Sequence, residues 1–182
     1  MSQVLEALHN DHRNYSRLLA LLKNDIDILQ HSEDPDFIRL YDIMNYMTNF
    51  PDVSHHPIEE IIFAALEQKA PASTEQIKQQ NSEHRQINKL GMSLKEKLQL
   101  VTSGSILSRD SIINAANDYY QLLTNHINIE EGQLFPIVEN VFTTEDWALL
   151  DLQINDMEDP LFGDAVQEQF TDLYTRITVE EK

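Results

Sequence analysis

The chain of 182 residues contains no cysteine. Disulfide bonds, thiolate zinc sites, iron–sulfur clusters and cysteine nucleophiles are therefore excluded together. Any metal site must instead be built from histidine, carboxylate or other oxygen ligands. The lack of cysteine is also compatible with a reducing compartment.

Basic residues and long apolar runs are scarce as well. Only 13 Lys and Arg accompany 31 Asp and Glu, for a formal net charge of −18. Nucleic acids and anionic membrane surfaces both attract clustered positive charge, so we expect neither as a partner. The longest apolar runs, LLALL (18–22) and IIFAAL (61–66), are far too short to span a bilayer. The beginning, MSQVLEALHNDHRNY, has no apolar signal-peptide core, so we expect a cytoplasmic protein.

Glycine is rare, with 4 residues, and apolar residues recur at helical spacing. The pattern predicts four long helices, over about residues 4–29, 40–66, 73–101 and 109–141. Pro51 and Pro57 fall within the second, so we expect a break around FPDV (50–53), with Pro57 in the first turn of the resumed helix. Ser73 and Gln76 resemble a capping box at the start of the third helix. No stretch alternates like a β-strand.

The C-terminal part is strongly acidic. Residues 145–182 hold 11 Asp and Glu but only 2 Lys and Arg, which is typical of a solvated outer face. Thr143 with Asp146 predicts a short helix, and EDPLFGD (158–164) predicts a turn into a last one. We therefore predict an all-α bundle over 1–141 and an acidic helical extension, packed on the bundle, over 142–182.

Two motifs occur twice along the chain. DHR (11–13) recurs as EHR (83–85), and H-x-x-I-E-E (55–60) recurs at 126–131. Each recurrence lies about 70 residues later, so the chain looks like two copies of one helical hairpin. Two such hairpins facing each other form an up-down-up-down four-helix bundle.

The second motif places a histidine and a glutamate on one helical face. Residues i and i+4 lie one turn apart, so His55 and Glu59 can reach one point, as can His126 and Glu130. A single H-x-x-x-E is usually a surface pair. Two copies in register, each preceded by an acid-His-Arg on another helix, instead predict that four imidazoles and two carboxylates meet in the apolar interior. Unsatisfied polar groups are costly there, and a metal centre resolves that cost.

The repeat also decides between neighbouring candidates. It favours His12 over His9, His55 over His56, and the first glutamate of each Glu-Glu pair over the second. The predicted metal ligands are His12, His55, Glu59, His84, His126 and Glu130. We interpret His9 and His31 as solvated, whereas His56 could either support the site or be plainly exposed.

The ligand types favour iron or manganese. Six ligands without a thiolate do not suit tetrahedral structural zinc, and four imidazoles do not suit Ca²⁺ or Mg²⁺. If both carboxylates bridge, the protein supplies about eight bonds of the about twelve that two octahedral metals need. The shortfall leaves room for a solvent bridge and an exogenous ligand such as O₂. The ferritin-like Glu-x-x-His pattern has the opposite order and a different spacing, so that family is disfavoured.

These motifs resemble the hemerythrin-like (HHE cation-binding) family. The resemblance rests on His12, HHPIEE (55–60), EHR (83–85) and HINIEEGQLFP (126–136), and it covers about residues 1–141. It implies an up-down four-helix bundle and a non-haem di-iron centre of two Fe ions with an oxo or hydroxo bridge, manganese or zinc being disfavoured. The tail, with DW and DPLFG, looks like that of stand-alone bacterial members.

Two departures from oxygen-carrying hemerythrins bear on function. Those proteins place a second histidine four residues after the one on the third helix, where this chain has Asn88. The fourth-helix carboxylate is Glu130, rather than an aspartate one residue further on. One iron should therefore have fewer nitrogen ligands, which disfavours simple O₂ transport.

We expect a protein that binds O₂ or another small diatomic ligand such as NO, or iron itself, for sensing, storage or stress protection. One alternative is a di-iron redox enzyme acting on peroxide or NO. Another is repair of damaged iron–sulfur centres, although similar members carry an N-terminal Cys-containing segment that this sequence lacks. A helical interaction module with a merely structural site is a further alternative, and the sequence indicates no protein partner.

Overall fold

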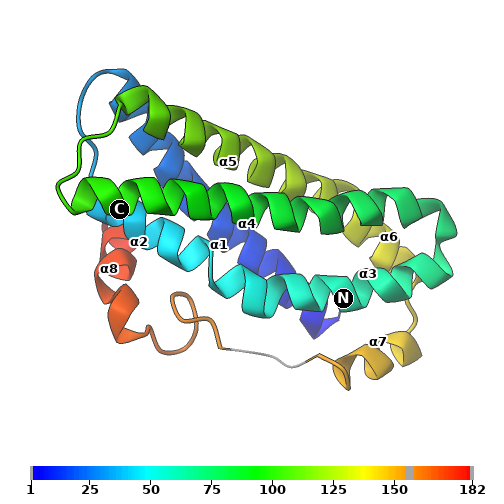
Figure 1. Cartoon of the computed structure of the whole chain (residues 1–182). Coiled ribbons are helices and arrows are strands. Elements are labelled where there is room, and N and C mark those ends of the chain that lie inside the picture. The colour runs from blue at the N-terminus through cyan, green and yellow to red at the C-terminus, as the bar shows by residue number, and fades with distance from the viewer. Residues whose placement is uncertain (1, 155–157, 181–182) are drawn as a thin grey trace.

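The computed structural model describes residues 2–154 and 158–180. Within them the chain forms helices and no strand (Figure 1). The α-helices are α1 (Gln3–Gln30), α2 (Phe37–Met47), α3 (His56–Lys69), α4 (Thr74–Thr102), α5 (Arg109–Ile129), α6 (Phe135–Val141), α7 (Thr144–Asp151) and α8 (Thr171–Glu180). Two π-helical turns (Pro51–His55 and Glu130–Leu134) and two 3₁₀ turns (Pro71–Ser73 and Glu168–Phe170) complete the described elements.

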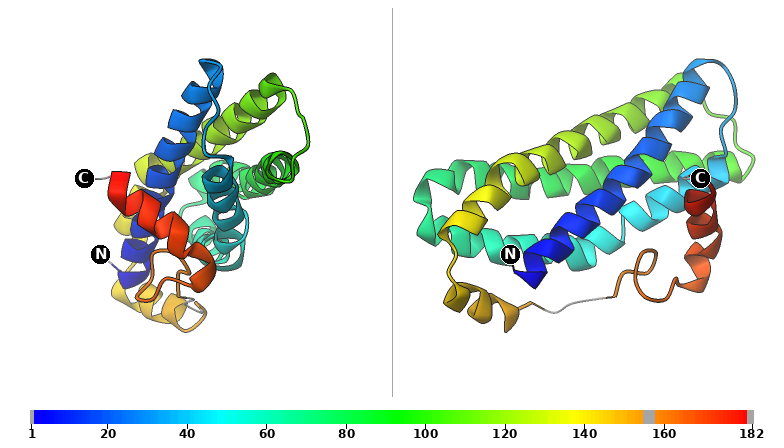
Figure 2. Two further views of the ribbon diagram at one scale, coloured as in Figure 1. Left: turned by 90° about the vertical axis from the view of Figure 1, so that its left-hand side faces the viewer. Right: turned by 180° about the vertical axis from the view of Figure 1, so that it is seen from behind.

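The predicted all-α bundle is confirmed. Its four rods are α1, α2 followed by α3, α4, and α5 followed by α6, and successive rods run in opposite directions (Figures 1 and 2). α4 packs against α5 and α2, and α1 packs against α5. No helix in the described part of the chain combines the length and apolar character required to cross a membrane.

Side-chain caps explain where several helices begin. Asp36 accepts hydrogen bonds from two amides at the start of α2, and Thr143 and Asp146 form the predicted capping box of α7. The capping box predicted for Ser73 and Gln76 is wrong. Ser73 closes a 3₁₀ turn in helical conformation and makes no side-chain cap, while the Gln76 amide donates to Gln133.

Two rods are interrupted by π-helical turns. The predicted break in the second rod is confirmed, with Pro57 in the first turn of α3. The predicted fourth helix, over about 109–141, is confirmed in extent, but a π turn that the sequence did not reveal separates α5 from α6. Pro136 follows that turn and has no amide hydrogen to donate to the carbonyl four residues before it. Each turn carries a predicted ligand, His55 at the end of the first and Glu130 at the start of the second.

The core consists of two hydrophobic clusters separated by a polar layer. On α1, Leu8 belongs to one cluster and Tyr15 to the other, and His12 lies between them in sequence. The same alternation holds on α4, where His84 lies between Ile77 and Ile87. Because both clusters are extensively buried, the bundle can tolerate a polar layer in its middle. The predicted ligands are the side chains of that layer.

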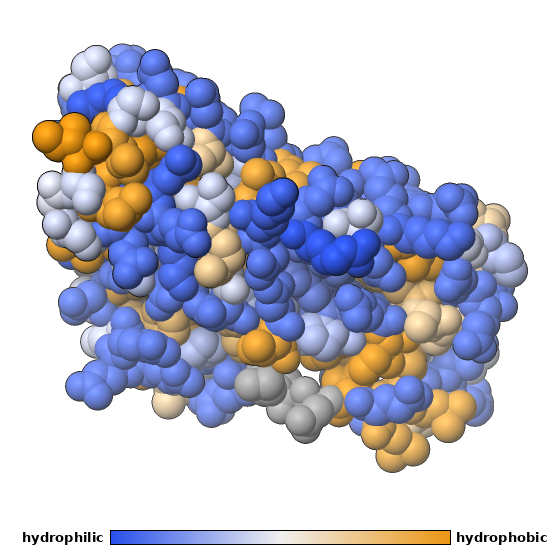
Figure 3. Space-filling view, viewed as in Figure 1, coloured by the Kyte–Doolittle hydropathy of each residue, from blue (hydrophilic) through white to orange (hydrophobic). Residues whose placement is uncertain are grey.

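The segment after α6 also contacts the bundle. Phe170, Leu173 and Ile177 are buried in the same cluster as Tyr46, whose hydroxyl donates to Asp159 at 2.8 Å. α7 lies at one end of the bundle, and α8 packs on α2 at the other (Figures 1 and 2). The viewed surface is mostly hydrophilic, with hydrophobic side chains gathered where α7 lies (Figure 3). The division into units at residue 141 stays a prediction.

Candidate metal centre

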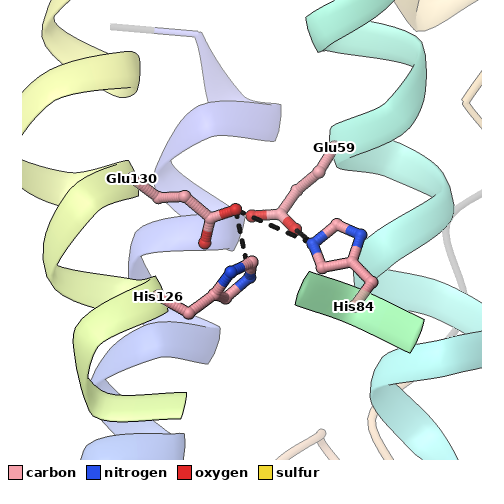
Figure 4. Close-up of side chains that lie close together, drawn as sticks. All are labelled: Glu59, His84, His126 and Glu130. Atoms are coloured by element: carbon pink, nitrogen blue, oxygen red, sulfur yellow. Dashed lines mark ion pairs between the residues drawn. The ribbon is translucent and has the colours of Figure 1, made fainter. Parts of the chain in front are cut away.

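The structure brings all six predicted ligands together in the polar layer. Their exposed fractions run from 0% for Glu59 and Glu130 to 5% for His84. α1 supplies His12, the second rod supplies His55 and Glu59, α4 supplies His84, and the fourth rod supplies the remaining two. Figure 4 shows the carboxylates of Glu59 and Glu130 reaching toward each other from facing helices. That these six residues ligate metal stays a prediction.

One half of the layer groups two histidines with one oxygen of each carboxylate. The Oε1 atom of Glu59 lies 3.2 Å from the Nε2 atom of His55 and 3.6 Å from the Nε2 atom of His12. The Oε2 atom of Glu130 lies 3.4 Å from the same nitrogen of His12. His12, His55 and Glu59 therefore form one group that could hold a metal ion, and Glu130 approaches this group at His12.

The other half uses the remaining oxygens. The Oε2 atom of Glu59 lies 3.3 Å from the Nε2 atom of His84. The Oε1 atom of Glu130 lies 3.2 Å from the Nε2 atom of His126 and 3.7 Å from that of His84. Each carboxylate thus contributes one oxygen to each half, which is the arrangement of two bridging ligands.

These donors suit a pair of transition-metal ions. Bonds of about 2.0–2.2 Å place neighbouring donors roughly 3 Å apart around one metal, close to the distances observed here. None of the four oxygens of Glu59 and Glu130 accepts a well-formed hydrogen bond from the described residues, although all four are buried. Buried carboxylates without well-formed hydrogen bonds are costly, and metal ions would supply the missing bonds. The mixed imidazole and carboxylate set fits iron or manganese.

Carboxylates outside the cluster orient two of the histidines. The Nδ1 atom of His55 lies 3.0 Å from Asp11, and the Nδ1 atom of His126 lies 3.2 Å from Glu83. A proton donated from Nδ1 to a carboxylate leaves the Nε2 lone pair facing the cluster, as metal ligation requires. The acid that precedes each histidine in DHR and EHR therefore supports a histidine on the neighbouring helix. The repeat contained this signal, but sequence reasoning assigned the acids no role.

Glu131 supports His12 in a similar way. Its Oε1 atom lies 2.7 Å from the Nδ1 atom of His12, and its Oε2 atom lies 2.7 Å from the Nδ1 atom of His9. The interpretation of His9 as solvated is therefore wrong, because its side chain is 20% exposed and paired. Glu60 holds the corresponding position in the first motif but is exposed. His31 is exposed, as predicted.

His84 is oriented differently. Its Nδ1 atom has no hydrogen-bond partner among the described residues. The ring of His56 stacks on it instead, with centroids 4.1 Å apart and planes 13° apart. The Nδ1 atom of His56 lies 2.9 Å from the carboxylate of Asp52. The side-chain amide of Asn88 donates a hydrogen bond to the same carboxylate. His56 was expected either to support the site or to be plainly exposed, and this packing favours support of the site.

Burial and opposing charges control the protons of the cluster when no metal is bound. Burial disfavours the His55 imidazolium, but Glu59 and Asp11 outweigh this and raise the His55 pKa to about 10. Burial and the charge of Glu59 raise the pKa of Glu130 to about 8. Burial lowers the pKa of His126 to about 2, so this ring is neutral. At neutral pH the cluster therefore holds protons that compete with metal ions.

Replacement of Asp11 tests the role of the supporting carboxylates. Asp11→Ala should lower metal affinity about 10–100-fold, because His55 loses the acceptor that fixes its ring. Glu6→Ala is the matched control, since it removes one exposed carboxylate from the same helix. Competition with a chromophoric chelator would measure both affinities. Equal affinity in the two variants would show that Asp11 does not position the ligand.

The comparison with known proteins agrees with this geometry. The sequence model of the family described as Hemerythrin HHE cation binding domain matches residues 3–138, which is well over half of the chain. No curated protein and no solved structure gives a significant match. The matched range contains all six predicted ligands, and the buried His and Glu cluster suggests a metal site. The family resemblance is thereby confirmed: the chain belongs to the hemerythrin HHE cation-binding domain family.

Proposed function

We propose that the chain binds two iron ions, one in each half of the polar layer. The observation that carries this proposal is the sharing of carboxylates, since Glu59 and Glu130 each have one oxygen beside a histidine of each half. His12 and His55 would hold one ion, and the histidines of α4 and α5 the other. Bound iron would supply redox-active positions at which a small molecule can be taken up.

A small cavity beside the cluster supports a diatomic ligand. Its walls include His12, His55 and His126, so it reaches both halves of the layer. Its volume, measured as the space open to the centre of a water molecule, is about 10 Å³. That is room for about one water-sized ligand. Such a cavity favours O₂ or NO over a larger organic substrate.

Within this proposal the protein residues have defined tasks. The paired histidines and shared carboxylates hold the ions, and Asp11, Glu83 and Glu131 fix the imidazole rings. The two hydrophobic clusters on either side of the layer exclude bulk water. We propose binding of a small diatomic ligand, for sensing, storage or stress protection, as the main function. Redox turnover of peroxide or NO at the same centre is the second candidate, because the cavity would also admit those molecules.

Anaerobic reconstitution separates these functions. Protein loaded with ferrous iron should retain about two ions per chain after desalting. Addition of O₂ or NO should then change the optical spectrum, and reversal on ligand removal without product formation would support binding. Sustained consumption of ligand would support the enzymatic alternative. Recovery of one tightly bound zinc with no iron uptake would contradict the proposal.

A further inference from the structure

Two tyrosines line the cavity beside the predicted ligands. Tyr15 and Tyr119 are 2% and 1% exposed, and both contribute to the same walls as His12, His55 and His126. Neither hydroxyl has a hydrogen-bond partner within residues 2–154 and 158–180. The cavity has room for about one water molecule, and its walls include these two side chains with unpartnered hydroxyls.

An unpartnered buried hydroxyl is costly, so its presence requires a reason. Phenylalanine would fill almost the same volume without that cost. Tyr46 shows the usual solution nearby: its ring lies 6.3 Å from that of Tyr15, and its hydroxyl donates to Asp159 at 2.8 Å. Tyr15 and Tyr119 lack such an acceptor among the described residues, which points to an acceptor that enters the cavity.

Both rings are placed relative to the metal ligands by the helices that carry them. Tyr15 follows His12 by three residues on α1, and its ring meets His55 edge-on with centroids 5.1 Å apart. Tyr119 precedes His126 by two helical turns on α5, so the two side chains share a face.

Gly91 on α4 makes room for the Tyr119 ring. A Cβ atom at this position would lie 3.0 Å from the Cε2 atom of Tyr119 and 2.8 Å from a methyl group of Thr48. The absence of that atom lets the ring pack directly on α4. Burial also raises the pKa of both Tyr15 and Tyr119, so each hydroxyl keeps its proton and can donate a hydrogen bond to a ligand.

We propose that the hydroxyls of Tyr15 and Tyr119 donate hydrogen bonds to a small anionic ligand in this cavity and thereby select ligands by charge. The inference rests on the proposed function, because the ligand would be held beside the two iron ions. It adds a specificity that the metal ligands alone do not provide. Burial of negative charge without hydrogen-bond donors is costly, whereas two fixed donors stabilise an anionic ligand more than a neutral one.

Cyanide, a diatomic anion, is a suitable probe. It would be titrated into oxidised, iron-loaded protein and followed by optical absorption. Tyr15→Phe and Tyr119→Phe should each weaken cyanide binding about tenfold or more, as expected for loss of one hydrogen bond to a charged group. Iron content, measured before and after titration, should stay at the wild-type value. The melting temperature of the chelated variants should not fall, since no internal hydrogen bond is lost.

Tyr46→Phe is the matched control. It also removes a buried hydroxyl, but one that is bonded to Asp159, so it should lower the melting temperature and leave cyanide affinity unchanged. Cyanide affinity within about twofold of wild type in both cavity variants would overturn the inference, as would an equal loss in Tyr46→Phe. Failure of iron-loaded wild type to bind cyanide would overturn it while leaving iron binding intact. Failure to bind iron would instead remove the proposed function itself.

Discussion

The iron-loaded protein is expected to unfold about 8–16 °C above the same protein after chelation. Metal bound only by the folded state adds about 4 kcal/mol at a thousandfold excess over its dissociation constant, and each 1 kcal/mol raises the melting temperature by about 2–4 °C in a chain of this size. The structural reason is the polar layer, where four buried carboxylate oxygens of Glu59 and Glu130 lack well-formed hydrogen bonds from the described residues.

Chelation should leave the protein helical, because the two hydrophobic clusters do not depend on metal. Circular dichroism during thermal unfolding would measure both helical content and melting temperature. Identical melting temperatures with and without iron would show that the layer is not a metal site. Collapse of the helical signal on chelation at 25 °C would instead show that the clusters cannot hold the bundle alone.

The difference in melting temperature should widen as pH rises from about 6.5 to 8.5. Burial opposes the charge on His84, but Glu130 and Glu59 raise its pKa to about 9, and the pKa of His55 is raised to about 10. The pKa of Glu130 is raised to about 8. In this window these three groups bind more protons in the folded metal-free protein than in the unfolded chain, so the stability that they contribute falls as pH rises. Metal must displace those same protons, so its affinity rises. A constant or narrowing difference would contradict this coupling.

The buried cluster of histidines and glutamates could be predicted because the repeat constrains it twice. A single His55–Glu59 pair is ambiguous, but the equivalent His126–Glu130 pair fixes the helical face in both halves. The structure agrees with this choice, since Glu59 is fully buried and Glu60 is exposed. The bundle could be predicted for the same reason, because each copy of the repeated hairpin must turn its histidines and glutamate toward the other copy. Helical periodicity and repeated motifs can be counted in the sequence itself, so they can be recognised without a structure.

The surroundings of the cluster could not be predicted in this way. Glu131 reaches back from the fourth rod to His12 and His9, a contact that depends on how two distant helices pack. The π turn after α5 was also missed, because a proline near the end of a helical pattern does not reveal which hydrogen bonds will rearrange. The Tyr119 hydroxyl was hidden for a similar reason, since an aromatic residue at helical spacing is ordinarily part of the core.

Glu130→Gln is expected to abolish binding of the metal pair while sparing the metal-free fold. The substitution removes a carboxylate whose oxygens face both halves of the layer. Metal affinity should fall more than about a hundredfold, because loss of a group that only orients a ligand already costs about 10–100-fold. The metal-free protein should be little affected near pH 7. Burial and the Glu59 charge already hold Glu130 largely protonated there, and glutamine has nearly the same shape.

Glu60→Gln provides the control, because Glu60 is an exposed glutamate from the equivalent Glu-Glu pair and should retain full metal content. Elemental analysis after reconstitution would compare iron per chain, and thermal unfolding of the chelated proteins would compare their folds. Equal iron content in the two variants would refute the bridging arrangement. A large drop in the melting temperature of chelated Glu130→Gln would refute the protonation argument instead. The two measurements therefore test separately whether Glu130 serves the metal ions and whether its carboxyl group is neutral without them.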